Sequence, residues 1–226
     1  MLERCILTTT KTKNIDKHPL VAREGWLYLS LAVVAAIFAY LVLGAAVFLV
    51  FFLLALFVLQ FFRDPHRAIP QEAGTVVSPA DGKVIFVGEV NDPYLDRKAL
   101  KISVFMNVFS VHSNRAPLSG QVKKIEYSPG LFVNAALDKA SEANERNAIV
   151  IEDTAGRQIV SVQVAGLVAR RILCYANVGD ELERGERYGF IRFGSRVDLF
   201  LPSDFETRVS VGDNVSSGRD ILGGFS

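Results

Sequence analysis

A single apolar run dominates the first third of the chain. No Asp, Glu, Lys, Arg or His interrupts the 37 residues from Trp26 to Phe62. A straight helix of this length would measure roughly 55 Å, whereas the hydrocarbon core of a bilayer is about 30 Å thick. Two short helices that turn near Gly44 fit this thickness better than one steeply tilted span. The pattern therefore predicts a hydrophobic helical hairpin over residues 26–62.

Positive charges lie on both sides of this run. Basic residues before it include Lys11, Lys13, Lys17 and Arg23, and those after it include Arg63 and Arg67. Because basic residues favour the cytoplasmic side of a membrane, we expect a cell-membrane hairpin whose two ends lie in the cytoplasm, with the domain that follows. A cleaved signal peptide has a much shorter apolar region, and a buried core helix would show a polar face, so both alternatives fit less well.

From Asp64 onward the chain changes to short β-rich runs separated by Gly, Pro and Asn. We predict strands over residues 83–90, 100–106, 121–127, 148–152, 158–164, 188–193, 196–201 and 207–211. Helices are expected only over 132–143 and 166–173. The predicted fold class is α+β and mostly β. It consists of a hammerhead or barrel-sandwich-like domain over 63–226, preceded by a polar leader over 1–25 and the helical hairpin.

A weak internal repeat runs through the β-rich part. Val178-Gly179-Asp180 is followed by Gly185, and Val211-Gly212-Asp213 is followed by Gly218 with the same spacing. Likewise, Asp81-Gly82-Lys83-Val84 is similar to Ser119-Gly120-Gln121-Val122. Such a pattern is typical of small hammerhead units, although Gly-Asp is also simply a common turn dipeptide.

Net charge and cysteine content indicate which partners and which cellular compartment to expect. The formal net charge is +1, so no strong field attracts nucleic acid, and we expect no nucleic-acid partner. The two cysteines, Cys5 and Cys174, cannot form a disulfide framework, which favours a reducing compartment.

The sequence has no phosphate-binding loop, no zinc-type Cys/His spacing and no nucleophile elbow. Three weaker signals remain as candidates for catalytic residues. The chain has three histidines, and only His112 lies well inside the β-rich part, in a polar loop that follows a buried strand. His18 and His66 flank the apolar run. The second signal is the turn Ser78-Pro79-Ala80-Asp81-Gly82, and the third is the Gly194-Ser195 link between two apolar strands. Taken singly, each has an ordinary structural explanation.

Several ordered blocks together carry more weight. They are Phe62-Arg63-Asp64-Pro65, Ser78-Pro79-Ala80-Asp81-Gly82, Phe105-Met106 with Val111-His112 and Asn114-Arg115-Ala116-Pro117, Asn144-Glu145-Arg146-Asn147, Ala165-Gly166-Leu167-Val168-Ala169-Arg170-Arg171-Ile172, and Arg192-Phe193-Gly194-Ser195-Arg196-Val197-Asp198. From about residue 24 to 202, the chain resembles phosphatidylserine decarboxylases of the short prokaryotic type.

The resemblance implies a self-processing enzyme. Ser195 attacks the carbonyl of Gly194, the chain divides between them, and Ser195 becomes a covalent pyruvoyl cofactor. That group forms a Schiff base with the amine of phosphatidylserine and promotes its decarboxylation to phosphatidylethanolamine. The resemblance further implies that Asp81 and His112 assist Ser195. It implies no metal.

The resemblance also implies partners: a phospholipid in the membrane, and a large and a small chain that stay associated after cleavage. A homodimer is compatible with it, and the sequence leaves the oligomeric state open. Arg115 and Arg196 are candidates for binding the lipid phosphate, since a guanidinium can hold two phosphate oxygens. Longer family members carry a second histidine three residues after the first, where this chain has Arg115. Either His112 serves both cleavage and decarboxylation, or another group helps.

Three other interpretations are weaker. Asp138-Lys139-Ala140 looks like a lipoylation tripeptide, but a modified lysine should lie at a tight hairpin tip, whereas this stretch is polar and favours a helix. A related phosphoserine lipid could replace phosphatidylserine. A soluble amino acid as substrate would leave the membrane segment without a purpose.

Overall fold

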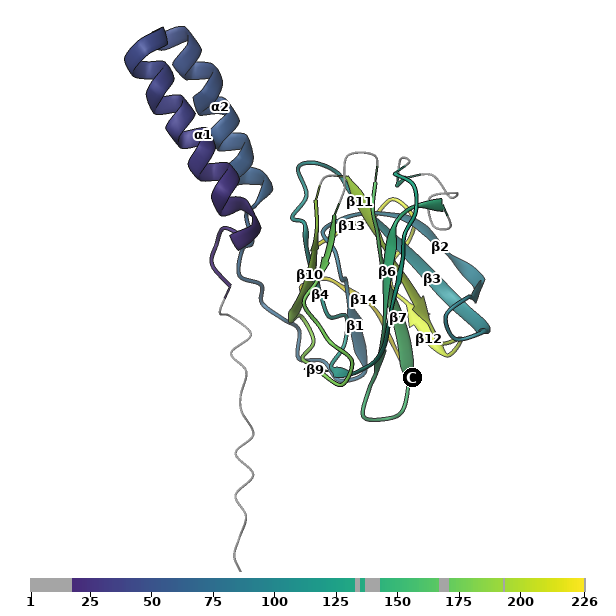
Figure 1. The fold of residues 1–226 in the computed structure, drawn as a ribbon. Helices are drawn as coiled ribbons and strands as arrows, with labels where there is room; N and C mark the ends of the chain where they lie inside the picture. Colours follow the sequence, from purple (N-terminus) through teal and green to yellow (C-terminus); the bar gives the residue numbers. More distant parts are fainter. Residues whose placement is uncertain (1–17, 133–134, 137–142, 167–170, 193, 226) are drawn as a thin grey trace, which may run out of the picture.

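The protein consists of a helical hairpin beside a β domain (Figure 1). A computed structural model describes residues 18–132, 135–136, 143–166, 171–192 and 194–225. The lipoylation-like tripeptide, Cys5 and most of the helix predicted over 132–143 lie outside these residues.

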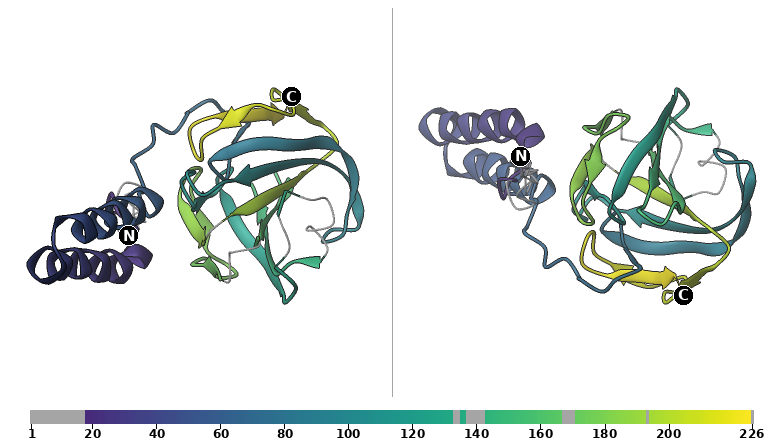
Figure 2. Two further views of the ribbon diagram at one scale, coloured as in Figure 1. Left: turned by 90° about the horizontal axis from the view of Figure 1, so that it is seen from above. Right: turned by 90° about the horizontal axis from the view of Figure 1, so that it is seen from below.

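The hairpin has the turn that the apolar pattern predicts. After a short 3-10 turn (η1, Arg23–Gly25) come α1 (Trp26–Phe38), a π-helical turn (η2, Ala39–Leu43) and α2 (Ala45–Phe61). Gly44 separates the helices with a φ of +90°, a backbone conformation that favours glycine. The two helices lie side by side and antiparallel (Figures 1 and 2).

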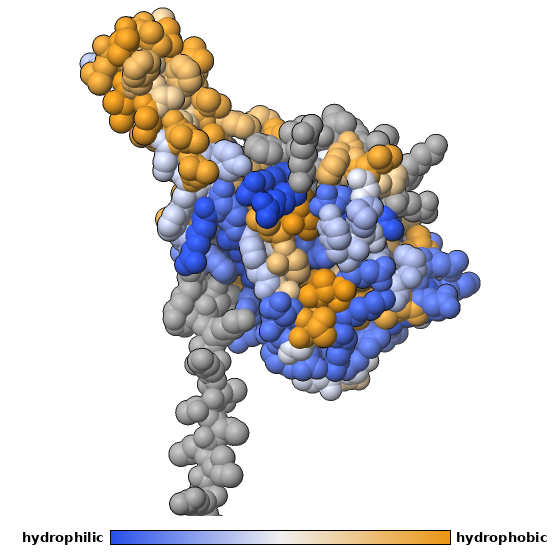
Figure 3. Space-filling view, viewed as in Figure 1, coloured by the Kyte–Doolittle hydropathy of each residue, from blue (hydrophilic) through white to orange (hydrophobic). Residues whose placement is uncertain are grey.

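The surface of the hairpin is apolar all round, unlike most of the domain face seen in Figure 3. Large side chains such as Leu31, Phe38 and Leu41 are more than half exposed. By length and composition, Arg23–Leu43 is one helix that could cross a membrane, and Ala45–Phe61 is a shorter apolar helix. A helix that is hydrophobic on every side and not covered by protein is suited to lipid.

The base of the hairpin is fastened to the domain by apolar packing and by buried charges. Phe61 and Phe62 pack with Phe190 of the domain. Four charged residues form what we call the hairpin-base ion cluster: Glu24, Asp64, Arg115 and Arg187. Its N···O distances are 2.8 Å for Arg115–Asp64, 2.9 Å for Arg187–Glu24 and 3.5 Å for Arg187–Asp64.

The β domain is built on an eight-stranded antiparallel sheet that curls around the core (Figure 2). Its order is β13 (Asn214–Val215), β2 (Gly82–Asp92), β3 (Arg97–Met106), β11 (Ser195–Leu201), β7 (Gln158–Val164), β6 (Arg146–Glu152), β5 (Gly120–Ser128), β9 (Glu181–Leu182). One three-stranded sheet contains β1 (Thr75–Val77), β14 (Ile221–Phe225) and β12 (Phe205–Thr207). The other contains β4 (Ser113–Arg115), β10 (Arg187–Ile191) and β8 (Ile172–Cys174). The predicted fold class is confirmed.

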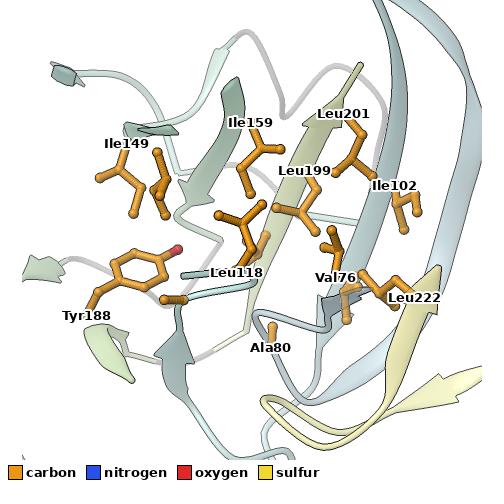
Figure 4. Close-up of a cluster of buried hydrophobic side chains, with 14 of the residues drawn as sticks. Val76, Ala80, Ile102, Leu118, Ile149, Ile159, Tyr188, Leu199, Leu201 and Leu222 are labelled. Atoms are coloured by element: carbon orange, nitrogen blue, oxygen red, sulfur yellow. The ribbon is translucent and has the colours of Figure 1, made fainter. Parts of the chain in front are cut away.

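Strand β11 runs through the middle of this arrangement and is buried along its whole length. Its side chains alternate between the two faces of the sheet. Val197, Leu199 and Leu201 enter the main core with Ile102 and Ile159, as Figure 4 shows for the labelled leucines and isoleucines. Arg196, Asp198 and Phe200 point to the other face, where Phe200 joins a second apolar cluster.

The internal repeat is a structural one. Gly179 N–H donates to Val122 O and Gly212 N–H donates to Val84 O, both at 2.8 Å. In return, Val122 N–H donates to Asp180 O at 2.9 Å and Val84 N–H donates to Asp213 O at 2.8 Å. The correspondence extends to two polar side chains. Ser217 N–H donates to Asp81 Oδ1 at 2.6 Å, and Arg184 N–H donates to Ser119 Oγ at 2.9 Å. Asp81 and Ser119 therefore occupy equivalent positions.

Most of the predicted strands are confirmed, and two other predictions are wrong. Of the strand expected over 207–211, only Thr207 lies in a strand, as the last residue of β12. The rest is not a strand because Asp213 closes a tight turn there: Ser210 N–H donates to its carboxylate at 2.8 Å. The helix expected over 166–173 is contradicted in its described end, since Ile172–Cys174 is strand β8 paired with β10. Residues 167–170 of that prediction lie outside the described residues.

Candidate active site

Ser195 is the first residue of β11 and lies at the rim of the core. It pairs with Met106 of β3, and its side chain is fully buried. Within the described parts of the chain, Ser195 Oγ has no hydrogen-bond partner. A buried hydroxyl without a partner is energetically unfavourable, and such an atom calls for a functional explanation.

The peptide bond before Ser195 has an unusual backbone. Gly194 has a φ of +58°, in the left-handed region that residues with a Cβ adopt at a cost of about 1–2 kcal/mol. Its carbonyl lies directly against Gly166, where a Cβ would come within 1.7 Å of Gly194 O. Gly166 belongs to one of the sequence blocks that resemble the family, although the sequence alone indicates no role for it.

His112 lies immediately before β4 and is buried against the end of the helical hairpin. Its ring centroid is 4.2 Å from that of Phe61, the last residue of α2, and 6.3 Å from that of Phe190. His112 Nδ1 lies 2.9 Å from Ser110 O, and only a protonated Nδ1 can donate to that carbonyl. In the neutral ring Nε2 then carries the lone pair, and this atom is buried without a partner in the described structure.

The pKa of His112 is lowered to about 4, mainly by burial; the hydrogen bond to Ser110 partly opposes this shift, and the nearby Arg63 guanidinium makes a smaller lowering contribution. The ring is therefore neutral at physiological pH. Neutral imidazole with a free Nε2 is the form that accepts a proton.

Asp81 precedes β2 at the same end of the sheet. Gly82 packs against the backbone of Phe105 and Met106, and Met106 pairs with Ser195. Strand β3 thus separates β2 from β11, which places their backbones about 10 Å apart. The Asp81 carboxylate accepts hydrogen bonds from Arg67 Nη2 at 2.7 Å and from Ser217 N–H. Among the described residues, no hydrogen bond joins Asp81 to His112 or Ser195.

The loop that carries His112 connects these groups. Arg115 N–H donates to Pro79 O at 3.0 Å, close to Asp81, and Ile191 N–H donates to His112 O at 3.2 Å, three residues before Gly194. The structure therefore gathers Asp81, His112 and Ser195 at one end of the domain, next to the hairpin.

The two candidate arginines are buried and already engaged. Arg115 Nη2 donates to Asp64 and Nη1 donates to Gly185 O at 3.0 Å, which places Arg115 in the hairpin-base ion cluster. Arg196 points to the opposite face of the sheet from Ser195. There it pairs with Asp198 at 2.8 Å and donates to Ala135 O at 3.0 Å. Binding of lipid phosphate by either residue stays a prediction that these contacts do not favour.

A buried amide network beside Met106, the strand partner of Ser195, was not foreseen from the sequence. Gln163 Nε2 donates to Asn114 Oδ1 at 2.8 Å, and Asn147 Nδ2 donates to Gln163 Oε1 at 3.2 Å. Asn114 Nδ2 in turn lies 3.9 Å from Met106 Sδ. The sequence signal that could have indicated this network is the presence of polar residues at strand positions that face the core. Within the described residues, no group of three His, Cys, Asp or Glu side chains could hold a metal ion.

Comparison with known proteins adds the family. The sequence model of phosphatidylserine decarboxylases matches residues 54–223. The chain belongs to this family. It is 58% identical to the phosphatidylserine decarboxylase proenzymes of Burkholderia pseudomallei and Burkholderia mallei over 205 residues, which is 91% of this chain and 95% of those proteins. Its identity to the proenzyme of Paraburkholderia phymatum is 56%, over 91% of this chain and 97% of that protein.

The matched range contains all the candidate site residues. The matched range begins inside α2 and includes Asp81, His112, Gly166, Gly194 and Ser195. The relatives are named proenzymes, a term for a precursor that must be processed. A site built around a glycine–serine bond, with a buried hydroxyl on one side and a left-handed glycine on the other, is consistent with such a precursor.

Proposed function

We propose that this protein decarboxylates phosphatidylserine to phosphatidylethanolamine with a pyruvoyl group made from its own Ser195. The observation that carries this proposal is the Gly194-Ser195 link. In it, a fully buried hydroxyl that has no hydrogen-bond partner among the described residues follows a glycine in a left-handed conformation, in a chain of this family.

The first step is an attack by Ser195 Oγ on the carbonyl carbon of Gly194. The C–O bond that forms is an ester, the C–N bond that breaks frees the amine of residue 195, and His112 Nε2 takes the hydroxyl proton. Loss of the Cα proton then expels Gly194 as a carboxylate. Water next releases ammonia from residue 195, which leaves a ketone beside the carbonyl of the small chain.

Asp81 supports this step from the side of β2. Its two hydrogen bonds fix the carboxylate near the loop that carries His112. Because Arg67 pairs with this carboxylate at 2.7 Å, its charge is largely balanced. We therefore assign Asp81 a positioning role, in which it holds the turn whose Pro79 carbonyl accepts a hydrogen bond from the loop that carries His112.

The residues present fit a pyruvoyl group at position 195. The site is buried and next to apolar and amide side chains, so bulk water is excluded. A pyruvoyl ketone condenses with a primary amine and withdraws the electron pair released with CO2. We assign the return of a proton to the substrate carbon to His112, whose neutral ring can accept and donate a proton.

The hairpin brings the site to the substrate. The His112 ring contacts Phe61 at the end of α2, so the site lies where the chain leaves the apolar hairpin. We infer that the hairpin inserts in the cell membrane from the cytoplasmic side. A phospholipid head group at that surface is then beside His112 without leaving the bilayer.

The small chain beginning at residue 195 stays bound after cleavage in this proposal. Strand β11 pairs with β3 along seven residues and with β7 along five. Its core side chains are also fully buried. Breaking one bond at the end of such a strand leaves these contacts in place.

Intact mass of the purified protein tests the proposal. We expect two chains divided between Gly194 and Ser195, the smaller lighter than its sequence mass by one ammonia, and release of CO2 from phosphatidylserine vesicles. Ser195→Ala should remain one chain without activity, while Ser203→Ala, which changes a serine outside the site, is the matched control. A wild-type protein that stays whole yet decarboxylates the lipid contradicts the proposal.

A further inference from the structure

We propose that Gly166 is a positioning residue for self-cleavage, because only glycine at this place lets the Gly194 carbonyl lie where Ser195 can attack it. This inference rests on the proposed function and deepens it. It assigns a task to a residue that contacts the carbonyl of the bond to be broken and lies just beyond the end of β7, a strand other than the one that holds Ser195.

The contact follows from the register of two strands. Val164 of β7 pairs with Arg196 of β11, so the antiparallel ladder continued by two residues brings Gly166 opposite Gly194. A Cβ at residue 166 would lie 1.7 Å from Gly194 O and 2.8 Å from Gly194 C. Both are backbone atoms, so no rotation of a side chain can relieve the overlap.

Gly166 itself has little freedom to retreat. The preceding residue is held at both backbone groups, since Ala165 N–H donates to Glu145 O at 2.9 Å and Asn144 Nδ2 donates to Ala165 O at 2.6 Å. Ala135 blocks another direction, with its Cβ 3.3 Å from the added carbon. Arg196 fixes Ala135 in turn by its hydrogen bond to the Ala135 carbonyl.

The displacement therefore falls on Gly194. An ordinary contact requires the carbonyl oxygen to move by more than about 1 Å, and a misplacement of that size can cost roughly 100-fold in rate. Rotation of the carbonyl also changes the angle at which Ser195 Oγ meets it. A methyl group at residue 166 should thus impair the attack while the strands around it remain paired.

Gly120 provides a matched control for the effect on folding. A Cβ at Gly120 would lie 2.3 Å from Glu152 O, the same kind of overlap with a neighbouring strand, but at the paired ends of β5 and β9. We compare Gly166→Ala and Gly120→Ala by thermal unfolding and by the first-order rate of conversion to two chains, at a temperature where both are folded. We expect conversion to slow about 100-fold for Gly166→Ala and to stay near the wild-type rate for Gly120→Ala. Equal rates for wild type and Gly166→Ala, or equal slowing of both variants, overturn the inference.

Hydroxylamine identifies the step. It cleaves an ester between residues 194 and 195, so it should divide wild-type precursor quickly but divide Gly166→Ala about 100-fold more slowly, since the ester forms slowly in that variant. Division of Gly166→Ala at the wild-type rate would show normal attack and refute the inference. A wild-type protein that stays whole with and without hydroxylamine refutes the proposed function instead.

A second variant keeps the test decisive if Gly166→Ala folds poorly. Ala135→Gly added to Gly166→Ala removes the 3.3 Å contact and leaves the overlap with the Gly194 carbonyl. We expect this double variant to fold better and still cleave slowly. Wild-type cleavage by it would show that the carbonyl contact is not the cause.

Discussion

Burial of His112 predicts an acid-sensitive fold. The pKa of His112 is about 4 in the folded protein, against about 6.5 for a histidine in an unfolded chain. The unfolded state therefore takes up this proton first as the pH falls. Stability from the neutral ring is complete above about pH 6.5 and is lost progressively down to about pH 4. Between pH 7 and pH 5 the free energy of unfolding should fall by about 2 kcal/mol, which corresponds to roughly 4–8 °C in melting temperature for a chain of this size.

The assay compares Ser195→Ala with Ser195→Ala/His112→Asn, so that both proteins are single chains. Asparagine does not titrate, and its amide can still donate to Ser110 O. We expect the double variant to be less stable at pH 7 because it leaves space beside Phe61, yet to lose about 2 kcal/mol less than the single variant on acidification to pH 5. The other histidines are common to both proteins and cancel. If the melting temperatures of the two proteins fall by the same amount between pH 7 and pH 5, the assignment of a buried, neutral His112 is refuted.

Two further predictions concern residues around the site. Asp81→Ala should slow self-cleavage. The control variant Ser119→Ala removes the equivalent hydrogen bond from Arg184 N–H, so it should lower stability by about 1 kcal/mol and leave the cleavage rate unchanged. If gel densitometry gives equal cleavage rates for the two variants, Asp81 has only a structural role in its turn. Asp64→Ala should lower the free energy of unfolding by roughly 3–5 kcal/mol, because it leaves the Arg115 charge buried without its carboxylate. Denaturant titration measures this change. A decrease below about 1 kcal/mol would contradict a stabilising role of the buried Asp64–Arg115 pair.

The sequence predicted those elements whose pattern is local. The period-two runs over 158–164 and 196–201 became β7 and β11 with nearly the same bounds, because alternation marks a strand with two different faces. The hairpin and its turn at Gly44 follow from apolar length alone. The Gly-Asp repeat was also visible, although only its hydrogen bonds to β2 and β5 show that it is structural.

Other elements depend on partners far away in the chain. Residues Ile172–Cys174 have a mixed apolar and basic surrounding that suits a helix, but pairing with Gly189–Ile191 makes them a strand, since tertiary contacts override weak propensity. Strand β14 was missed because its two central residues are glycines, which normally weaken strands.

Within the site, the sequence indicated Ser195, Asp81 and His112 through family blocks, and the structure places them at one end of the domain. The sequence could not indicate that Gly166 contacts Gly194, because that contact depends on the register between two strands. Asp64 was likewise unforeseen. Only the folded chain shows that this carboxylate, directly after the apolar run, meets two arginines from β4 and β10.

The hairpin-base ion cluster has a consequence for how the protein is handled. Its two carboxylates and two guanidinium groups balance in charge, and all four are largely shielded from solvent. Salt screens exposed charges strongly but buried pairs much less. High-salt washing should therefore neither strip the domain from membranes nor tilt it on its anchor, whereas detergent should release hairpin and domain together. With the hairpin inserted in a membrane as proposed, the same shielding should keep the height of the site above the lipid surface constant when ionic strength changes.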